Sequence, residues 1–506
     1  MSETNRDKYF ETSKVQSDLK DKSIRGGLFT ISGQMGAFAV QLVSSITLAR
    51  LLTPNDYGLI GMSVVLMNFA TLFRDMGLNM AVIQKKDVTH NQVSTLFWLQ
   101  LGICIILGIL VALTAPLIAW FYGEPRLVMV TLVLSITFVL SGLNLQYSAL
   151  LARQMRFGML SIIRISGALV GMICAITAAC LGWQYWALVV QMVLPLALAT
   201  VLYRVMCRWR PSLPQKNTGI RGFLRFGGHL TGFNMLNYFS RNADKILIGK
   251  YLPIEQLGFY NKAYELLMLP LRQVRDPVYT VAIPALSRVQ DDPVRYKRAF
   301  MSFQEKMCLV MIYPIAILTV GSDWIIEFVL GAKWLPASEI FSWLSITAIL
   351  QALLSGLGLL FISQGRTKEM FALGLFDSIT TVASFTVGIR WGVIGVAKLY
   401  FISSLIKTPI CIWYAGRRGH VSAKEIVRSI SPFAVSVIIL TGFLYALRMT
   451  LPILNSGVGI AILVSASLVY FAGCLIVSSS IRGNLVELAG WIKPYFSRKK
   501  RCRAIV

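Results

Sequence analysis

Charged residues are scarce in this chain, and acidic residues are the scarcer kind. Asp, Glu, Lys and Arg together make up 14% of the 506 residues, against about 25% in an average soluble domain. Hydrophobic residues make up 56%, and the mean hydropathy is +0.65. A water-soluble protein cannot bury that much apolar surface. The composition therefore excludes secreted, disordered and collagen-like chains and predicts an all-α, polytopic membrane protein.

Motifs that carry catalysis or bind metals are also missing. The 3 histidines lie far apart, and the 8 cysteines include no C-x-x-C pair, so we expect no metal site and no disulfide framework. The sequence has no G-x-x-x-x-G-K-[ST], no D-x-D, and no H-E-x-x-H or G-x-S-x-G in a suitable context. We therefore expect no cofactor, no internal ATPase and no enzymatic activity.

The net charge of +26 comes from 49 Lys and Arg residues against 23 Asp and Glu residues. Such an excess can attract nucleic acid, but in a membrane protein Lys and Arg accumulate on cytoplasmic loops. Most of these residues fall on alternate connections between apolar runs, for example at 204–225, 295–298, 417–428 and 493–503. We interpret the charge as a signal of topology, with no nucleic-acid partner and with both termini in the cytoplasm.

Apolar runs of about 20 residues, long enough to cross a membrane as a helix, predict fourteen spans. They lie near residues 26–49, 57–73, 94–120, 127–150, 159–180, 185–205, 224–249, 258–285, 307–330, 336–362, 370–389, 392–414, 430–449 and 457–480. We divide the chain into a cytoplasmic segment (1–24), a lobe of helices 1–6 (25–205), a cytoplasmic linker (206–223), a lobe of helices 7–12 (224–415), two additional helices 13–14 (416–480) and a basic cytoplasmic tail (481–506).

An internal repeat relates the two predicted lobes. A shift of 200 residues places LLTPNDYG (51–58) on YLPIEQLG (251–258), with Leu52 on Leu252 and Gly58 on Gly258. One further residue of shift aligns the Arg-Asp pair at 74–75 with that at 275–276. Six helices per lobe make this a parallel repeat about an axis along the membrane normal, a plan that is typical of alternating-access carriers.

Ionisable side chains within the spans are the candidate functional residues, because each costs at least about 2.5–3.5 kcal/mol in hydrocarbon. Arg241, Asp244 and Lys245 share one helix face. Basic groups outnumber acidic groups in the spans, which favours a cationic cavity for an anionic substrate, and arginine suits a diphosphate. Structural ion pairs, such as Arg241 with Asp244 or Lys245 with Glu265, are the alternative.

These considerations give three sets of candidate residues. The substrate-binding set is Arg241, Lys245, Arg164, Gln41, Ser44 and Asn237. Asp244, Glu265 and Asp377 are candidates for a coupling H⁺ or Na⁺. Arg74, Asp75, Arg275 and Asp276 are candidates for a cytoplasmic gate, with interfacial topology markers as the alternative.

Three stretches of the sequence, ARLLTPNDYGLIGMS, SRNADKILIGKYLPIEQLGFYNKAYELLMLP and VAIPALSRVQDD, resemble the polysaccharide transport family of flippases. That family belongs to the superfamily of the multidrug and toxin extruders, and the likeness is strongest to its Wzx-type, colanic acid branch. The resemblance implies two six-helix lobes around a central cavity. It also implies movement of undecaprenyl-diphosphate-linked oligosaccharides across the bacterial inner membrane, and cationic residues in the cavity, a role that falls on Arg241 and Lys245.

We therefore predict a multi-pass inner-membrane flippase for exopolysaccharide, capsule or O-antigen assembly, whose partners are a lipid-linked oligosaccharide and the lipid bilayer. H⁺ or Na⁺ and the polysaccharide polymerase or export machinery are further possible partners. An ion-coupled antiporter of small cationic drugs remains an alternative, although a basic cavity repels cations. A membrane polysaccharide polymerase would need a larger loop than the short outer connections provide. A scaffold that docks through the basic tail is a third alternative.

Overall fold

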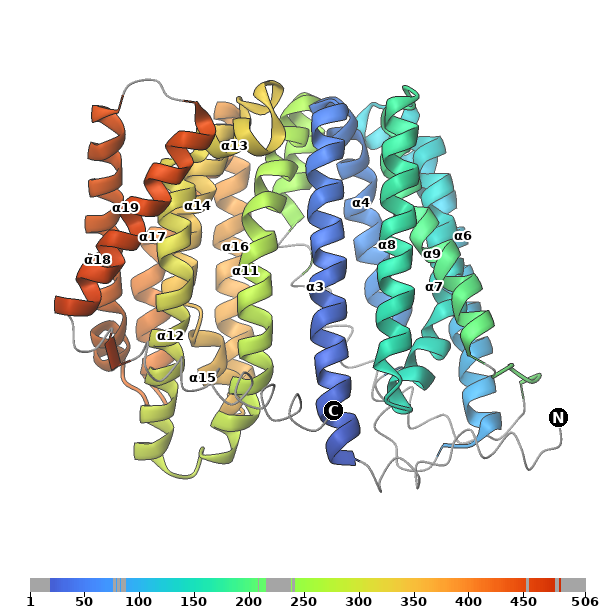
Figure 1. The fold of residues 1–506 in the computed structure, drawn as a ribbon, viewed down its shortest axis with the longest axis horizontal. Coiled ribbons are helices and arrows are strands. Elements are labelled where there is room, and N and C mark those ends of the chain that lie inside the picture. The colour runs from blue at the N-terminus through green and yellow to red at the C-terminus, as the bar shows by residue number, and fades with distance from the viewer. Residues whose placement is uncertain are drawn as a thin grey trace, which may run out of the picture. The chain divides into compact units, whose positions relative to one another are not determined.

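The computed structural model describes residues 19–75, 79, 82, 88–207, 209–214, 238, 242–451, 455–477 and 482–483, and this part of the chain contains helices but no strands (Figure 1). The chain forms two compact units, Met1–Gly258 and Phe259–Val506. Most of the predicted tail and most of the seventh span lie outside the described residues. The predicted lobe boundaries remain predictions.

The first unit contains six long described helices. They are α3 (Leu19–Leu51), α4 (Pro54–Asp75), α6 (His90–Tyr122), α7 (Arg126–Arg153), α8 (Phe157–Cys180) and α9 (Trp186–Met206). α6 packs on α7, and α8 packs on both α3 and α9. Residues 242–251 are also helical, and α11 (Ile254–Arg288) begins at the end of this unit.

The second unit contains the rest of α11 and eight more α-helices. They are α12 (Pro293–Val320), α13 (Ser322–Leu330), α14 (Ala337–Leu353), α15 (Leu357–Ser363), α16 (Thr367–Gly388), α17 (Gly392–Gly416), α18 (Ala423–Thr450) and α19 (Ser456–Val477). Two short 3₁₀ helices, η1 (Ala332–Trp334) and η2 (Ile389–Trp391), connect α13 to α14 and α16 to α17. The centre of this unit is α12, which packs on α14 and α18, whereas α17 packs on α14 and α16.

Local sequence signals set the helix ends. Thr89 and Gln92 form a capping box at the start of α6. That helix ends at Gly123, whose φ of 73° lies in the left-handed region that glycine adopts without a steric penalty. Ser422 and Glu425 form a second capping box at the start of α18. Both helices begin before the apolar runs predicted at 94–120 and 430–449, because their capping boxes precede those runs.

Within the described residues, nine helical stretches are long and apolar enough to cross a membrane, or ten if a bent pair is counted as one span. The bent pair is α14 and α15, which meet at 40° where the sequence predicts one span at 336–362. The predicted span at 307–330 combines the end of α12 with α13, because the chain breaks at Gly321. The multi-pass all-α architecture is confirmed, while the count of fourteen and the side on which the termini lie remain predictions.

Candidate functional site

A cavity of about 90 Å³ opens within the second unit, between α11, α12 and α14. Its polar lining comes from Arg272, Arg275 and Tyr279 on α11, from Gln351 on α14 and from Ser355 just after α14. Its apolar lining includes Met268, Leu271 and Met311. The cavity therefore combines positive charge with hydrogen-bonding groups, as an anion site requires.

The two arginines of this cavity differ in their partners. They are three residues apart, which places them on the same face of α11. The Arg275 Nε atom lies 3.1 Å from a carboxylate oxygen of Asp276. Arg272 is exposed, and no carboxylate of the described residues forms an ion pair with it. Arg272 is thus positioned to bind an anion without first releasing a partner.

Four other cations of the second unit each lie beside a carboxylate. Each of these residues has a carboxylate oxygen within 3.3 Å or less: Lys262 with Glu265, Lys398 with Glu339, Lys407 with Asp377, and Arg448 with Asp323. An ion pair lowers the cost of holding a charge in a low-dielectric region. Arg272 differs from these cations because its exposed guanidinium has no carboxylate partner among the described residues.

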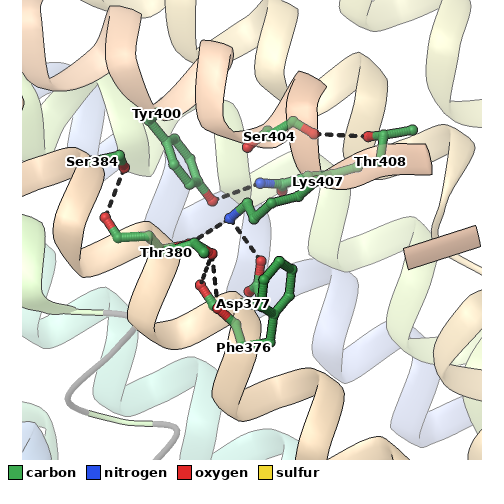
Figure 2. A network of polar contacts seen from close by, with 10 residues as sticks. Phe376, Asp377, Thr380, Ser384, Tyr400, Ser404, Lys407 and Thr408 are labelled. Carbon is green, nitrogen blue, oxygen red and sulfur yellow. Dashed lines mark hydrogen bonds and ion pairs between the residues drawn. The ribbon is translucent and has the colours of Figure 1, made fainter. Parts of the chain in front are cut away.

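A second polar cluster joins α16 and α17 (Figure 2). The Lys407 ammonium donates to the Asp377 carboxylate at 2.8 Å and to the Thr381 hydroxyl at 2.7 Å. The Lys407 side chain is 7% exposed, whereas that of Asp377 is 58% exposed. Lys407 also lines a mostly apolar groove of about 350 Å³ along these two helices. Asp377 therefore balances an ammonium group that would otherwise face hydrocarbon.

Gln351 connects the cavity to α17. Its side-chain amide donates to the Tyr400 hydroxyl at 2.8 Å, and the same glutamine lines the arginine cavity. Tyr400, Ser404 and Lys407 recur every three to four residues and lie near one another along α17 in Figure 2. Sequence reasoning missed Gln351 and Tyr400. The sequence feature that could have identified Gln351 is a polar amide within the otherwise apolar run of α14.

The predicted cavity residues of the first unit fall into three groups. Arg164 on α8 and Gln41 on α3 are exposed. Ser44 is buried, and its hydroxyl accepts a hydrogen bond from the Gln191 amide at 2.7 Å. Lys245 is half-buried, and its backbone N–H donates to the Asp244 carboxylate at 2.8 Å. Arg241 and Asn237 lie outside the described residues.

The candidate gate residues Arg74 and Asp75 end α4, whereas Arg275 and Asp276 lie within α11, which continues to Arg288. An Arg74 guanidinium nitrogen donates to the Ser141 hydroxyl at 3.2 Å, and its Nε atom is buried without a hydrogen-bond partner. The side chain of Asp75 lies outside the described part of the chain. Arg275 and Asp276 contact each other. Glu265 lies 3.3 Å from Lys262 on its own helix, and the alternative pair of Glu265 with Lys245 stays a prediction.

Comparisons with known proteins agree with the resemblance seen in the sequence. Residues 47–339 match the family described as polysaccharide biosynthesis protein. The teichuronic acid biosynthesis protein TuaB of Bacillus subtilis (strain 168) is 30% identical over 420 residues, which cover 80% of this chain and 85% of TuaB. The lipopolysaccharide biosynthesis protein WzxC of Escherichia coli (strain K12) is 25% identical over 397 residues, which cover 77% of this chain and 80% of WzxC.

Solved structures give the fold independently. The lipid II flippase MurJ, in an inward closed conformation, superposes with a TM-score of 0.69 and 14% identity, over 88% of this chain and 98% of that chain. At this identity the likeness concerns the fold alone. The family match spans more than half of the 506 residues. The chain therefore belongs to the polysaccharide biosynthesis protein family and has the fold of the lipid II flippase.

Proposed function

We propose that this protein is a flippase that moves undecaprenyl-diphosphate-linked oligosaccharide repeat units across the bacterial inner membrane. Family membership and the fold support the class of transporter. The observation that carries the choice of an anionic substrate is the exposed, carboxylate-free Arg272 beside Arg275 in the cavity of the second unit. The protein supplies binding and a path, and the reaction makes and breaks no covalent bond.

The physical task is to replace water around a diphosphate and several sugars. Moving such groups through bare hydrocarbon leaves their charges and hydroxyls without partners, at a cost of several kcal/mol for each group. Arg272 and the predicted Arg241, Lys245 and Arg164 would hold the diphosphate. Side-chain amides and hydroxyls, such as those of Gln41, Gln351, Ser44 and Asn237, would replace water around the sugars. The polyprenyl chain would remain in lipid.

Alternating access of the two repeats would carry the diphosphate from the cytoplasmic to the outer leaflet, with both termini in the cytoplasm. Arg74, Asp75, Arg275 and Asp276 would then lie at the cytoplasmic entrance, where the repeat places them in equivalent positions. Arg275 would serve both the entrance and the cavity.

Two of the three candidate carboxylates for a coupling H⁺ or Na⁺ already have a lysine partner. Asp377 and Glu265 each already contact an ammonium group. An H⁺ or Na⁺ bound at either carboxylate would have to compete with that ammonium group for the carboxylate oxygens. Asp244 remains a candidate for either ion.

Reconstituted proteoliposomes test this function. We expect the purified protein to move a short, fluorescently labelled lipid-linked oligosaccharide between leaflets, and an Arg241→Ala variant that inserts normally to lose that activity. A protein that instead moves small organic cations and leaves the lipid-linked oligosaccharide in place would establish the antiporter alternative.

A further inference from the structure

The two copies of the repeated motif fold in the same way. In the first copy the N–H of Leu52 donates to the carbonyl of Leu48 at 2.8 Å, and the next helix begins at Pro54. In the second copy the N–H of Leu252 donates to the carbonyl of Ile248 at 2.9 Å, and the next helix begins at Ile254. The offset between equivalent atoms is 200 residues, as in the sequence repeat.

These two helix starts pack directly on each other through glycine. A Cβ atom placed on Gly58 would lie 2.0 Å from the carbonyl oxygen of Ile254, and a Cβ atom placed on Gly258 would lie 1.9 Å from the carbonyl oxygen of Pro54. All four residues belong to the first compact unit. A shift by 200 residues converts either contact into the other, so the pair obeys a local two-fold symmetry of the kind found in isologous interfaces.

Glycine is required on both sides of this contact. A Cβ atom closer than 3.0 Å to another heavy atom is essentially never observed, and here the obstructing atoms are backbone oxygens, which cannot rotate away. Small residues allow helices in a membrane to approach at backbone distance. The Cα–H groups of the two glycines point at these carbonyl oxygens, an arrangement that recurs where helices touch.

Neighbouring contacts lie at the same end of the helices. A Cβ atom on Gly249, just before the second motif, would lie 2.9 Å from the ring of Tyr122 at the end of α6. The Lys250 ammonium donates to the carbonyl of Phe121 and lies 4.7 Å from the centre of its ring. The ends of α6 and of the helix at 242–251 thus extend the contact made by the two glycines.

We propose that the paired contact of Gly58 and Gly258 is the outer gate of the transporter, and that it is closed in this structure. The inference rests on the proposed function and on the predicted topology, which puts the helix starts at 54 and 254 on the outer side. Alternating access requires the two repeats to separate on one side at a time. A contact on the local two-fold axis, in which backbone oxygens are the nearest atoms to both glycines, can open and close as one unit.

Alanine at either glycine tests the gate directly. We expect Gly58→Ala and Gly258→Ala to prevent closure and to favour the outward-open state by about tenfold or more, because overpacking of a close contact is strongly unfavourable. Gly102→Ala is the matched control, since a Cβ atom there meets nothing within 4 Å. The reporter is a single cysteine at Met62, which is 1% exposed, in a variant without other cysteines, labelled from outside by a membrane-impermeant maleimide.

Faster outside labelling of Met62→Cys in both alanine variants, and not in the Gly102→Ala control, supports the gate. Unchanged labelling in variants that elute as folded monodisperse protein overturns it. Faster labelling from the cytoplasmic side only overturns the assignment of this gate to the outer face. The labelling needs no substrate, so it tests the gate separately from the proposed function. If labelling changes as expected but the protein flips no lipid-linked oligosaccharide, the proposed function is refuted and the gate is not.

A second experiment leaves both glycines in place. Asn55 and Glu255 are exposed equivalents that directly follow Pro54 and Ile254. We expect an Asn55→Cys, Glu255→Cys pair, once joined by a reducible bifunctional thiosulfonate reagent, to stop flipping, and reduction to restore it. Flipping that continues at full rate in the cross-linked protein would refute the gate even if the alanine variants fold poorly.

Discussion

Replacing Arg272 by glutamine is expected to reduce flipping strongly without destabilising the protein. The guanidinium is exposed in the cavity and forms no ion pair with a described carboxylate, so its removal leaves no buried charge behind. Hydrogen bonds to a charged group contribute about 1.5–3 kcal/mol. Since each 1.4 kcal/mol corresponds to a factor of ten, we expect the rate at low substrate concentration to fall about 10- to 150-fold.

The assay is the initial rate of flipping of a short lipid-linked oligosaccharide in proteoliposomes. Lys398→Gln is the control for loss of one positive charge, because Lys398 already contacts Glu339 and both side chains are about half exposed. Exposed pairs contribute about 0–1 kcal/mol, so this control should flip within about fivefold of the parent. Arg272→Lys retains the charge but loses the planar fork and should fall between the two.

Two outcomes would refute this reasoning. If a well-folded Arg272→Gln variant flips at the parental rate, the cavity in the second unit does not contact the diphosphate. If Arg272→Gln and Lys398→Gln lose activity equally, the effect reflects the overall charge of the unit instead of one binding group.

Three further predictions concern other contacts. Asp377→Asn should lower the free energy of unfolding by about 1–3 kcal/mol. This loss should exceed that of Lys407→Met, because the lysine is buried and the aspartate is not. Thermal unfolding of both variants and of the double variant in detergent measures the order, and the reverse order would contradict the role of the pair. Arg126 donates to Glu124 at 2.6 Å and thereby holds the pKa of this carboxyl below its ordinary value of 4.5. The ionised carboxylate therefore stabilises the fold above pH 4.5, and the difference in stability between the parent and Glu124→Gln should disappear as the pH falls through the lowered pKa. A difference that does not depend on pH would exclude this ion pair as its cause. Arg448→Gln should loosen the end of α18, because this arginine donates at 2.6 Å to a carboxylate on α13; unaltered hydrogen exchange there would contradict this.

The sequence predicts the class of fold because the signal for it, the length of apolar runs, lies in consecutive residues. Long apolar runs have to become membrane-spanning helices, since hydrocarbon offers backbone groups no other partner. Capping residues such as Thr89 and a glycine at 123 act within one turn, so they locate helix ends well. The repeat can also be read from the order of residues alone, and its alignment already places Gly58 and Gly258 at equivalent positions.

The site is harder to predict because pairing depends on helix rotation and depth. Lys407 and Asp377 are 30 residues apart on different helices, and only their packing shows that they contact each other. The same holds for Glu265, whose contact with Lys262 on its own helix was not among the pairs predicted from the sequence. The importance of Arg272 follows from its place in the cavity and from the contact of the neighbouring Arg275 with Asp276, and neither can be read from a sequence.

The central claim is that this protein moves a lipid-linked oligosaccharide to the outer leaflet. The most direct measurement is mass spectrometry of lipids from a strain that lacks the protein, together with the accessibility of the glycan on spheroplasts. We predict that an undecaprenyl-diphosphate oligosaccharide accumulates and cannot be reached from outside. Accumulation on the outer leaflet would contradict this account and would place the block after flipping.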